Sequence, residues 1–148
     1  MLKLKITTPE RIMLETEVNS VTLPTQLGQI TVLPKHIPLV ADLTSGEISY
    51  KKPGGEEFFA ISGGVVEVKE NGEIDVLADS AEFGHEIDIK RAEKAKQRAK
   101  EIMAGAYKDE KAFVDAAAGL EKHLARLKVA RKHRTRTHQN LESGTLPE

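Results

Sequence analysis

The chain lacks cysteine and tryptophan, and its few aromatic residues are two tyrosines and four phenylalanines among 148 residues. Without cysteine there can be no disulfide framework and no thiolate metal site, which agrees with a reducing compartment. No apolar run approaches the roughly 20 residues of a membrane-spanning helix, and residues 1–4 alternate like a strand instead of forming the apolar block of a signal peptide. We therefore expect an ordered chain with an aliphatic core and no direct membrane insertion.

Catalytic motifs are also missing from the sequence. The five histidines form no H-x-H pair and no H-E-x-x-H motif, so the pattern supports neither a cupin-like nor a zincin-like metal site. The glycine pairs at 54–55 and 63–64 lack the strand–glycine–helix setting of a phosphate loop, and no G-x-S-x-G motif marks a nucleophile. The sequence therefore predicts a protein that is not an enzyme and that requires no cofactor.

The net charge of −1 conceals a division of the chain into an acidic half and a basic half. Residues 1–86 carry 7 Lys and Arg against 14 Asp and Glu, which gives −7. Residues 87–148 carry 15 against 9, which gives +6. This asymmetry predicts two modules with different neighbours.

The first half alternates apolar and polar residues, as half-buried strands do. The segments that show this pattern are short and separated by turn residues: 2–7, 17–23, 29–33, 46–50, 58–62, 65–69 and 73–77. Asn71-Gly72 lies between the last two and tolerates positive φ angles, so we expect a hairpin over 65–78 with a type I′ turn. Many short strands at this spacing predict an all-β sandwich or barrel over residues 1–84.

The second half repeats apolar residues every three or four positions, which predicts helices over about 87–105 and 109–134. Asp109 is placed to cap the second helix. A short connection between two one-sided helices predicts an antiparallel α-helical hairpin over 85–136. Residues 137–148 show no period, and we expect a disordered tail there.

The apolar stripes of this hairpin consist mostly of alanine. Because burial contributes about 0.8 kcal/mol per CH₂ group, alanine faces hold helices together, or onto a sandwich, more weakly than leucine faces do. The composition therefore agrees with a hairpin that undocks at modest cost, although alanine-rich hairpins also occur in static bundles.

The segment I-D-I-K-R-A at 87–92 has two interpretations. Asp88 can cap the helix start and pair with Arg91, which accounts for both residues without any ligand. Alternatively, equal rise on both sides of a turn near Tyr107 would place Arg126 level with Asp88, and Lys122 level with Ala92. Four cations would then surround one groove suited to phosphate: Arg91, Arg98, Lys122 and Arg126.

The stretch from 122 to 136 carries seven Lys or Arg and no acid. It can be a solvated helix face, whose cations the helix dipole favours near the C-terminus. It can also bind an acidic protein partner or nucleic acid. Because aromatic stacking residues are absent and the other half of the chain is acidic, we expect an acidic protein surface, met by residues such as Arg131 and Arg134.

Four motifs follow one another along the chain: G-Q-I-T-V-L-P-K-H-I-P-L at 28–39, S-G-G-V-V-E-V at 62–68, V-L-A-D-S-A-E at 76–82, and I-D-x-x-R-A at 87–92. With the helical hairpin after them, the chain resembles the epsilon subunit of the rotary (F-type) ATP synthase from Leu2 to Arg136. One departure lies before His36, where the family usually has Gly or Asn and this chain has Lys35.

The resemblance implies an all-β N-terminal sandwich and a C-terminal helical hairpin in a non-catalytic central-stalk subunit of the proton-translocating ATP synthase. The sandwich would pack on the gamma subunit and touch the c-ring through His36 and Gln29, although an acid often stands at the position of Gln29. The hairpin would permit turnover when closed on the sandwich. When extended along gamma towards the alpha/beta hexamer, it would inhibit ATP hydrolysis.

The same resemblance places the chain as a peripheral subunit on the cytoplasmic face of the bacterial plasma membrane, in preference to the stromal face of a plastid membrane. In several bacterial members, the I-D-x-x-R-A motif marks a regulatory ATP site that holds the hairpin closed. This chain keeps Ile87, Asp88, Arg91 and Ala92, and it matches further positions of that site at Glu82, Arg98 and Arg126. Lys122 stands where an arginine is usual and lacks its planar two-pronged contact.

An alternative from another class is a free-standing nucleotide- or nucleic-acid-binding module that uses the basic helix. A rotor subunit should co-purify with a gamma-like partner, whereas such a module should bind RNA or DNA with a steep salt dependence. A catalytic β-sandwich ranks last, because no acid–base pair marks a site.

Overall fold

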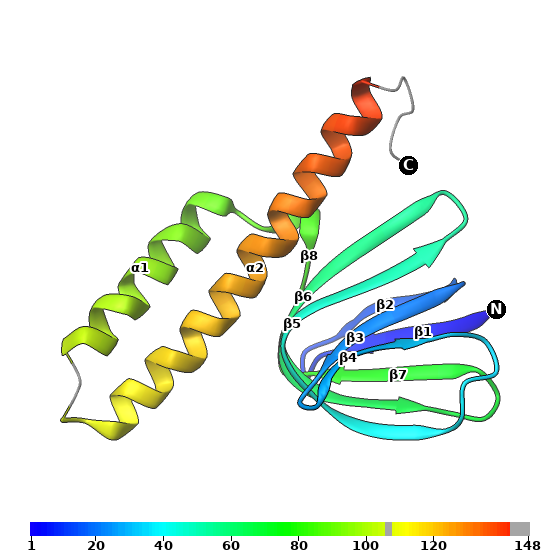
Figure 1. Cartoon of the computed structure of the whole chain (residues 1–148), viewed down its shortest axis with the longest axis horizontal. Helices are drawn as coiled ribbons and strands as arrows, with labels where there is room; N and C mark the ends of the chain where they lie inside the picture. The colour runs from blue at the N-terminus through cyan, green and yellow to red at the C-terminus, as the bar shows by residue number, and fades with distance from the viewer. Residues whose placement is uncertain (106–107, 143–148) are drawn as a thin grey trace.

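The computed structural model describes residues 1–105 and 108–142, which form a β-sandwich with a helical hairpin at one end (Figure 1). The sandwich contains eight strands: β1 (Leu2–Thr7), β2 (Ile12–Val18), β3 (Ser20–Thr25), β4 (Gly28–Val32), β5 (Leu39–Lys52), β6 (Gly55–Val68), β7 (Glu73–Ala78) and β8 (Ala81–Phe83). A 3₁₀ turn, η1 (Gly84–Glu86), leads into the helices α1 (Ile89–Gly105) and α2 (Glu110–Glu142). The predicted fold class is confirmed.

The strands form one hydrogen-bonded path in the order β2-β1-β7-β6-β5-β3-β4, with β8 paired to β6. Strands β5 and β6 are 14 residues long and serve both layers. The start of β6 pairs with β8, whereas its end pairs with β7. The segments 58–62 and 65–69 are therefore one continuous strand, and Figure 1 shows β5 and β6 curving around the edge of the sandwich.

The bend of β6 lies at Gly63-Gly64, where φ is +122° and +144°. Glycine is the residue that adopts such angles without steric cost. At Gly64 space is lacking as well, because a Cβ there would overlap the carbonyl oxygen of Leu77. The glycine pair is therefore a structural requirement of the sandwich, because the backbones of β6 and β7 approach each other closely at Gly64.

One core fills the sandwich, and it is built by the alternation of side chains along the strands. In β1 the inward residues are Leu2, Leu4 and Ile6, and in β6 they include Phe59 and Ile61. The buried residues of this cluster all belong to strands, so among the described residues no helix residue contributes to it. The sandwich therefore has a core of its own, separate from the hairpin.

The hairpin over 65–78 is confirmed, but the predicted type I′ turn is wrong. Among the described non-glycine residues only Lys35 has a positive φ, so Asn71 does not adopt the required conformation. Gly72 alone does, with φ +85°, and its N–H donates to Lys69 O while Lys69 N–H donates to Glu73 O. This is the three-residue connection in which a type I turn is followed by a left-handed glycine.

Both helices begin at an aspartate cap. Asp88 Oδ1 accepts from the N–H of Arg91, and Asp109 Oδ1 accepts from the N–H of Ala112, each at 3.1 Å. These bonds satisfy N–H groups that have no partner within the helix. The predicted cap at Asp109 is therefore confirmed, whereas residues 106–107, in the predicted turn, lie outside the described residues.

Helix α2 is longer than predicted, because it continues to Glu142. Residues 137–142 are thus helical and are not part of a disordered tail, while 143–148 lie outside the described residues. Extending an existing helix costs far less than starting one. The hydroxyls of Thr135 and Thr137 donate to the carbonyl oxygens four residues earlier in the same helix.

Candidate functional site

Helix α2 docks on the outer face of β5 and β6, and α1 packs against α2. In β6, Phe59 and Ile61 point into the sandwich, so Phe58 and Ala60 point outward. There they meet a small apolar cluster that contains buried residues of the helices and of the segment before α1: Ile87, Ala92, Leu127, Val129 and Ala130. Three of the six buried members of this cluster are alanines, so the docking surface is apolar but small.

One predicted site residue, Arg126, reaches from this interface to the last strand. Its Nε lies 2.9 Å from Oε2 of Glu82, and its guanidinium also lies 3.0 Å from Nδ1 of His123. The Arg126 side chain is only 17% exposed, so the guanidinium is partly withdrawn from water. Because a guanidinium has no acceptor, Nδ1 of His123 must be the acceptor in this bond.

The surroundings of His123 show that positive charge dominates here. Burial lowers the pKa of His123 from its usual 6.5, and the nearby charges of Arg126 and Lys122 lower it further, while Glu82 acts in the opposite direction. The neutral imidazole therefore sits beside two cations and one carboxylate. Such an environment favours an anionic ligand.

The contact between Asp88 and Arg91 is a hydrogen bond from the backbone N–H of Arg91 to the Asp88 carboxylate. Asp88 uses its carboxylate to cap α1, and among the described residues no ion pair joins its side chain to the exposed Arg91 guanidinium. The Asp88–Arg91 segment thus has the geometry of a helix start.

The register expected across the hairpin is wrong. Arg131 lies 2.6 Å from Glu93, and Ala92 packs in one cluster with Leu127 and Ala130. An alignment of Arg126 with Asp88 would have put Arg131 far beyond Glu93, because antiparallel helices have equal rise. The observed contacts instead shift Ala92 towards Leu127 and Ala130, and Arg98 is exposed on α1.

Glu47 contributes to the docking surface, although its sequence pattern did not predict this. This residue of β5 is buried beneath α2, and its Oε1 accepts from Nζ of Lys132 at 2.8 Å. Lys132 also lies over the ring of Phe58, with 5.5 Å from Nζ to the centroid. The two partners are 85 residues apart, and an acid in an alternating strand normally indicates a solvent-facing position. No sequence signal could have revealed this contact.

The predicted partner-contact residues Gln29 and Arg134 are exposed, and His36 is half-buried in the loop after β4. Lys35, next to His36, has φ +69°, the left-handed conformation that Gly and Asn adopt most readily. This geometry explains why Gly or Asn suits the position. Arg131 is also exposed, although it pairs with Glu93.

A second surface lies at the other end of the same two strands, also on their outer face. Val65 of β6 is paired with Leu77 of β7, and Val40 of β5 lies on the same face. They are 37%, 60% and 69% exposed, respectively, and line a shallow hollow with Lys5 and Glu67. Neighbouring exposed apolar side chains are more common at protein-interaction surfaces than elsewhere on a protein.

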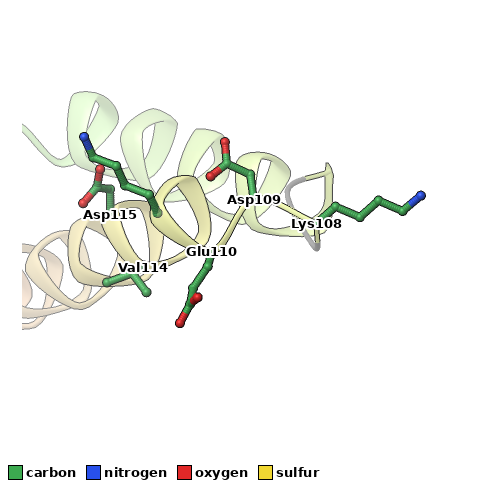
Figure 2. A pocket seen from close by; sticks show the side chains of 6 residues that line it. Lys108, Asp109, Glu110, Val114 and Asp115 are labelled. Carbon is green, nitrogen blue, oxygen red and sulfur yellow. The ribbon is translucent and has the colours of Figure 1, made fainter.

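A hollow at the start of α2 does not have the geometry of a ligand site. Figure 2 shows that Lys108, Asp109 and Glu110 point in different directions around it.

Among the described residues, no group of three or more His, Asp or Glu could hold a metal ion. The described helices include none that is long and apolar enough to cross a membrane.

Two family models match consecutive parts of the chain. The ATP synthase delta/epsilon chain β-sandwich domain matches residues 1–84, and the long α-helix domain of the same chain matches residues 85–131. The chain belongs to this family. The two matches meet at the start of η1, where the sandwich ends and the hairpin begins.

Curated relatives in the delta/epsilon chain family span nearly the same length. An ATP synthase epsilon chain of Dehalococcoides mccartyi is 42% identical over 133 residues, which are 90% of this chain and 94% of the relative. One of Geotalea daltonii is 40% identical over 131 residues, which are 88% of this chain and 94% of the relative. A chain in the Euglena gracilis mitochondrial ATP synthase structure (OSCP/F1/c-ring) aligns with a TM-score of 0.75 and 27% identity, covering 84% of this chain and 78% of that one.

Proposed function

We propose that the chain is a non-catalytic epsilon subunit in the central stalk of a proton-translocating ATP synthase, where it couples the rotor to the catalytic head. Its hairpin inhibits ATP hydrolysis when it leaves the sandwich and extends along the gamma subunit to the alpha/beta hexamer. Gamma packs on the surface around Val40, Val65 and Leu77, and the loop with Gln29 and His36 meets the c-ring. The subunit is thus peripheral to the membrane, on its cytoplasmic face in a bacterium.

The observation that carries the proposal is the separation of the two buried clusters. The sandwich core contains only strand residues among those described, whereas the hairpin attaches through a small alanine-rich cluster and ion pairs. The hairpin can therefore leave without opening the sandwich core. A ligand that binds only the docked form at 100 times its Kd would stabilise that form by about 2.7 kcal/mol, enough to bias such an interface.

ATP is the proposed regulatory ligand of the docked form. Arg91 and Arg98 are exposed on α1, and Lys122 and Arg126 lower the pKa of His123. Phosphate oxygens would compete with Glu82 for Arg126 and recruit the other cations by charge-assisted hydrogen bonds. Ile87 and Ala92, which are buried beside Asp88, would line the adjoining apolar side of the site.

The inhibitory role can be tested with a reversible lock. A Cβ on Gly84 would lie 3.2 Å from Cβ of His133, slightly inside the range of about 3.5–4.5 Å that a disulfide spans, and the chain has no cysteine to interfere. In the double variant Gly84→Cys/His133→Cys, oxidation should hold the hairpin docked and raise ATP hydrolysis by the assembled complex. Reduction should restore inhibition. The two single-cysteine variants are the controls, and equal hydrolysis in the oxidised and reduced double variant would refute the inhibitory role.

ATP gating has a separate test, calorimetric titration of the isolated chain with ATP and MgATP. We expect saturable binding that Arg98→Ala and Arg91→Ala each weaken roughly tenfold, because each loses a charge-assisted hydrogen bond. Asp88→Ser keeps a side chain that can cap the helix but removes the carboxylate. A change in ATP affinity in this variant would therefore reflect a ligand contact and not the loss of the cap. Lys94→Ala, an exposed cation of the same helix, is the matched control. Absence of heat and of thermal stabilisation at millimolar ATP would leave the hairpin without this ligand.

A further inference from the structure

Among the described residues, Glu47 is the only charged side chain that is buried, with 6% of its surface exposed. The sandwich core does not bury it. Ile48 and Tyr50 point into that core, so alternation along β5 puts Glu47 on the outer face. Its cross-strand partner is Ala60, which belongs to the cluster under α2. Docking of the hairpin is therefore what removes this carboxylate from water.

The docked state compensates Glu47 only in part. Oε1 accepts from the ammonium of Lys132, whereas Oε2 is buried without a hydrogen-bond partner in the described part of the chain. Removing a carboxylate from water costs several kcal/mol, and an opposite charge with good geometry is required to offset it. Lys132 supplies that charge, and the face of the Phe58 ring provides a second favourable contact for it.

Lys132 remains reachable from outside in the docked state. Its side chain is 44% exposed, against 5% for that of Glu47. A carboxylate on another molecule can therefore approach the ammonium before the hairpin moves. Once Lys132 turns to such a partner, Glu47 is left buried without a counter-charge, and the docked state loses stability.

We propose that Glu47 and Lys132 form a conditional latch. The hairpin stays docked only while Lys132 is paired with Glu47, and an acidic partner surface releases the hairpin by competing for Lys132. The inference rests on the proposed mobility of the hairpin. It assigns to Glu47 a destabilising role that the neighbouring ion pairs do not share, since Glu82 and Glu93 are only partly buried. The same ammonium cannot serve the sandwich and the partner at once.

The latch predicts an asymmetry between its two halves. Lys132→Gln leaves a buried carboxylate without its counter-charge, so the ratio of undocked to docked chain should rise at least about tenfold. Glu47→Gln removes the buried charge and returns Lys132 to water, so docking should be as strong as in the parent or stronger. The double variant should dock like Glu47→Gln, because the charge that drives undocking is gone.

Docking is measured in the isolated full-length chain by single-molecule energy transfer between dyes on Leu27→Cys and Val114→Cys. Both positions are exposed, one on the sandwich and one on α2, and the absence of native cysteine makes the labelling specific. Lys128→Gln is the matched control, because it removes an exposed lysine one turn earlier on α2. Circular dichroism of each variant verifies that the sandwich is folded.

A poly-L-glutamate peptide serves as the acidic competitor, with sodium chloride at equal ionic strength as its control. We expect the peptide to increase the undocked fraction of the parent but not that of Glu47→Gln. Undocking by Glu47→Gln to the same extent as Lys132→Gln would overturn the latch, as would a Lys132→Gln variant that docks like the parent. The docking experiment contains no ATP synthase. A failure of the latch would therefore not affect the outcome of the disulfide-lock experiment, which tests inhibition separately.

Discussion

Arg126 of α2 and Glu82 of β8 are joined by a 2.9 Å contact between Nε and Oε2, and this pair ties the middle of the second helix to the last strand of the sandwich. The Arg126 side chain is 17% exposed, whereas that of Glu82 is about one-third exposed. Removing the carboxylate therefore leaves a cation that has lost both water and its partner.

Glu82→Gln should lower the free energy of hairpin docking by about 1–2 kcal/mol, because a hydrogen bond to a charged group is lost and Arg126 stays partly buried. Glu93→Gln is the comparison, since it removes the exposed pair with Arg131 and should cost at most about 1 kcal/mol. Urea titration followed by helix circular dichroism measures both. Equal losses in the two variants would mean that burial of Arg126 does not matter.

The stability of the hairpin should fall in acid because of His123. Its pKa in the folded chain is lowered by burial and by Arg126 and Lys122, so the unfolded chain binds the proton more tightly. The contribution of His123 is therefore complete above about pH 6.5, the usual pKa, and is lost as the pH falls through the lower folded value. Urea midpoints between pH 5 and 8 should show this slope. His123→Gln should flatten this slope.

Lys35 carries backbone strain that a substitution could relieve. Its φ of +69° costs a side chain with a Cβ about 1–2 kcal/mol, and asparagine tolerates the conformation better. Lys35→Asn should therefore raise the free energy of unfolding by about 0.5–1 kcal/mol in chemical denaturation. Lys3→Asn, on an exposed position of β1, is the control for loss of a lysine, and it should not stabilise.

Gly64→Ala should be severely destabilising, by about 4 kcal/mol or more, because the new Cβ would meet the carbonyl oxygen of Leu77 on a neighbouring strand. Gly28→Ala isolates the conformational part of this effect. Gly28 has φ +120°, but no atom lies within 4 Å of the place that an alanine methyl group would take, so only strain should be felt there. Thermal melting compares the two, and a similar melting temperature for both variants would exclude the steric explanation.

Much of the fold could be predicted from local patterns in the sequence. Alternation located most strands, the three-to-four period located both helices, and the capping aspartates Asp88 and Asp109 were readable from their positions. Strand β2 and the first half of β5 were not predicted, because the alternation of apolar and polar residues is interrupted there and much of their surface is exposed. Two separate strands were predicted where β6 is continuous, because a glycine pair often ends a strand. In β6 the pair Gly63-Gly64 only bends it.

The site depended on distances that no local pattern encodes. The register of the hairpin is set by contacts such as Arg131 with Glu93, and an estimate from the turn alone placed Arg126 beside the wrong residue. The burial of Glu47 results from a helix that begins more than sixty residues later. Motif matching nevertheless singled out Glu82 and Arg126, which the structure brings into contact.

The length of β5 and β6 has a mechanical consequence. Glu47 and Phe58 lie under the hairpin, whereas Val40 and Val65, on the same two strands, lie on the exposed apolar surface. Two hydrogen-bonded strands of 14 residues connect these places without an intervening loop. A displacement of one surface can therefore pass to the other along continuous hydrogen-bonded backbone, which changes direction at the glycine bend of β6.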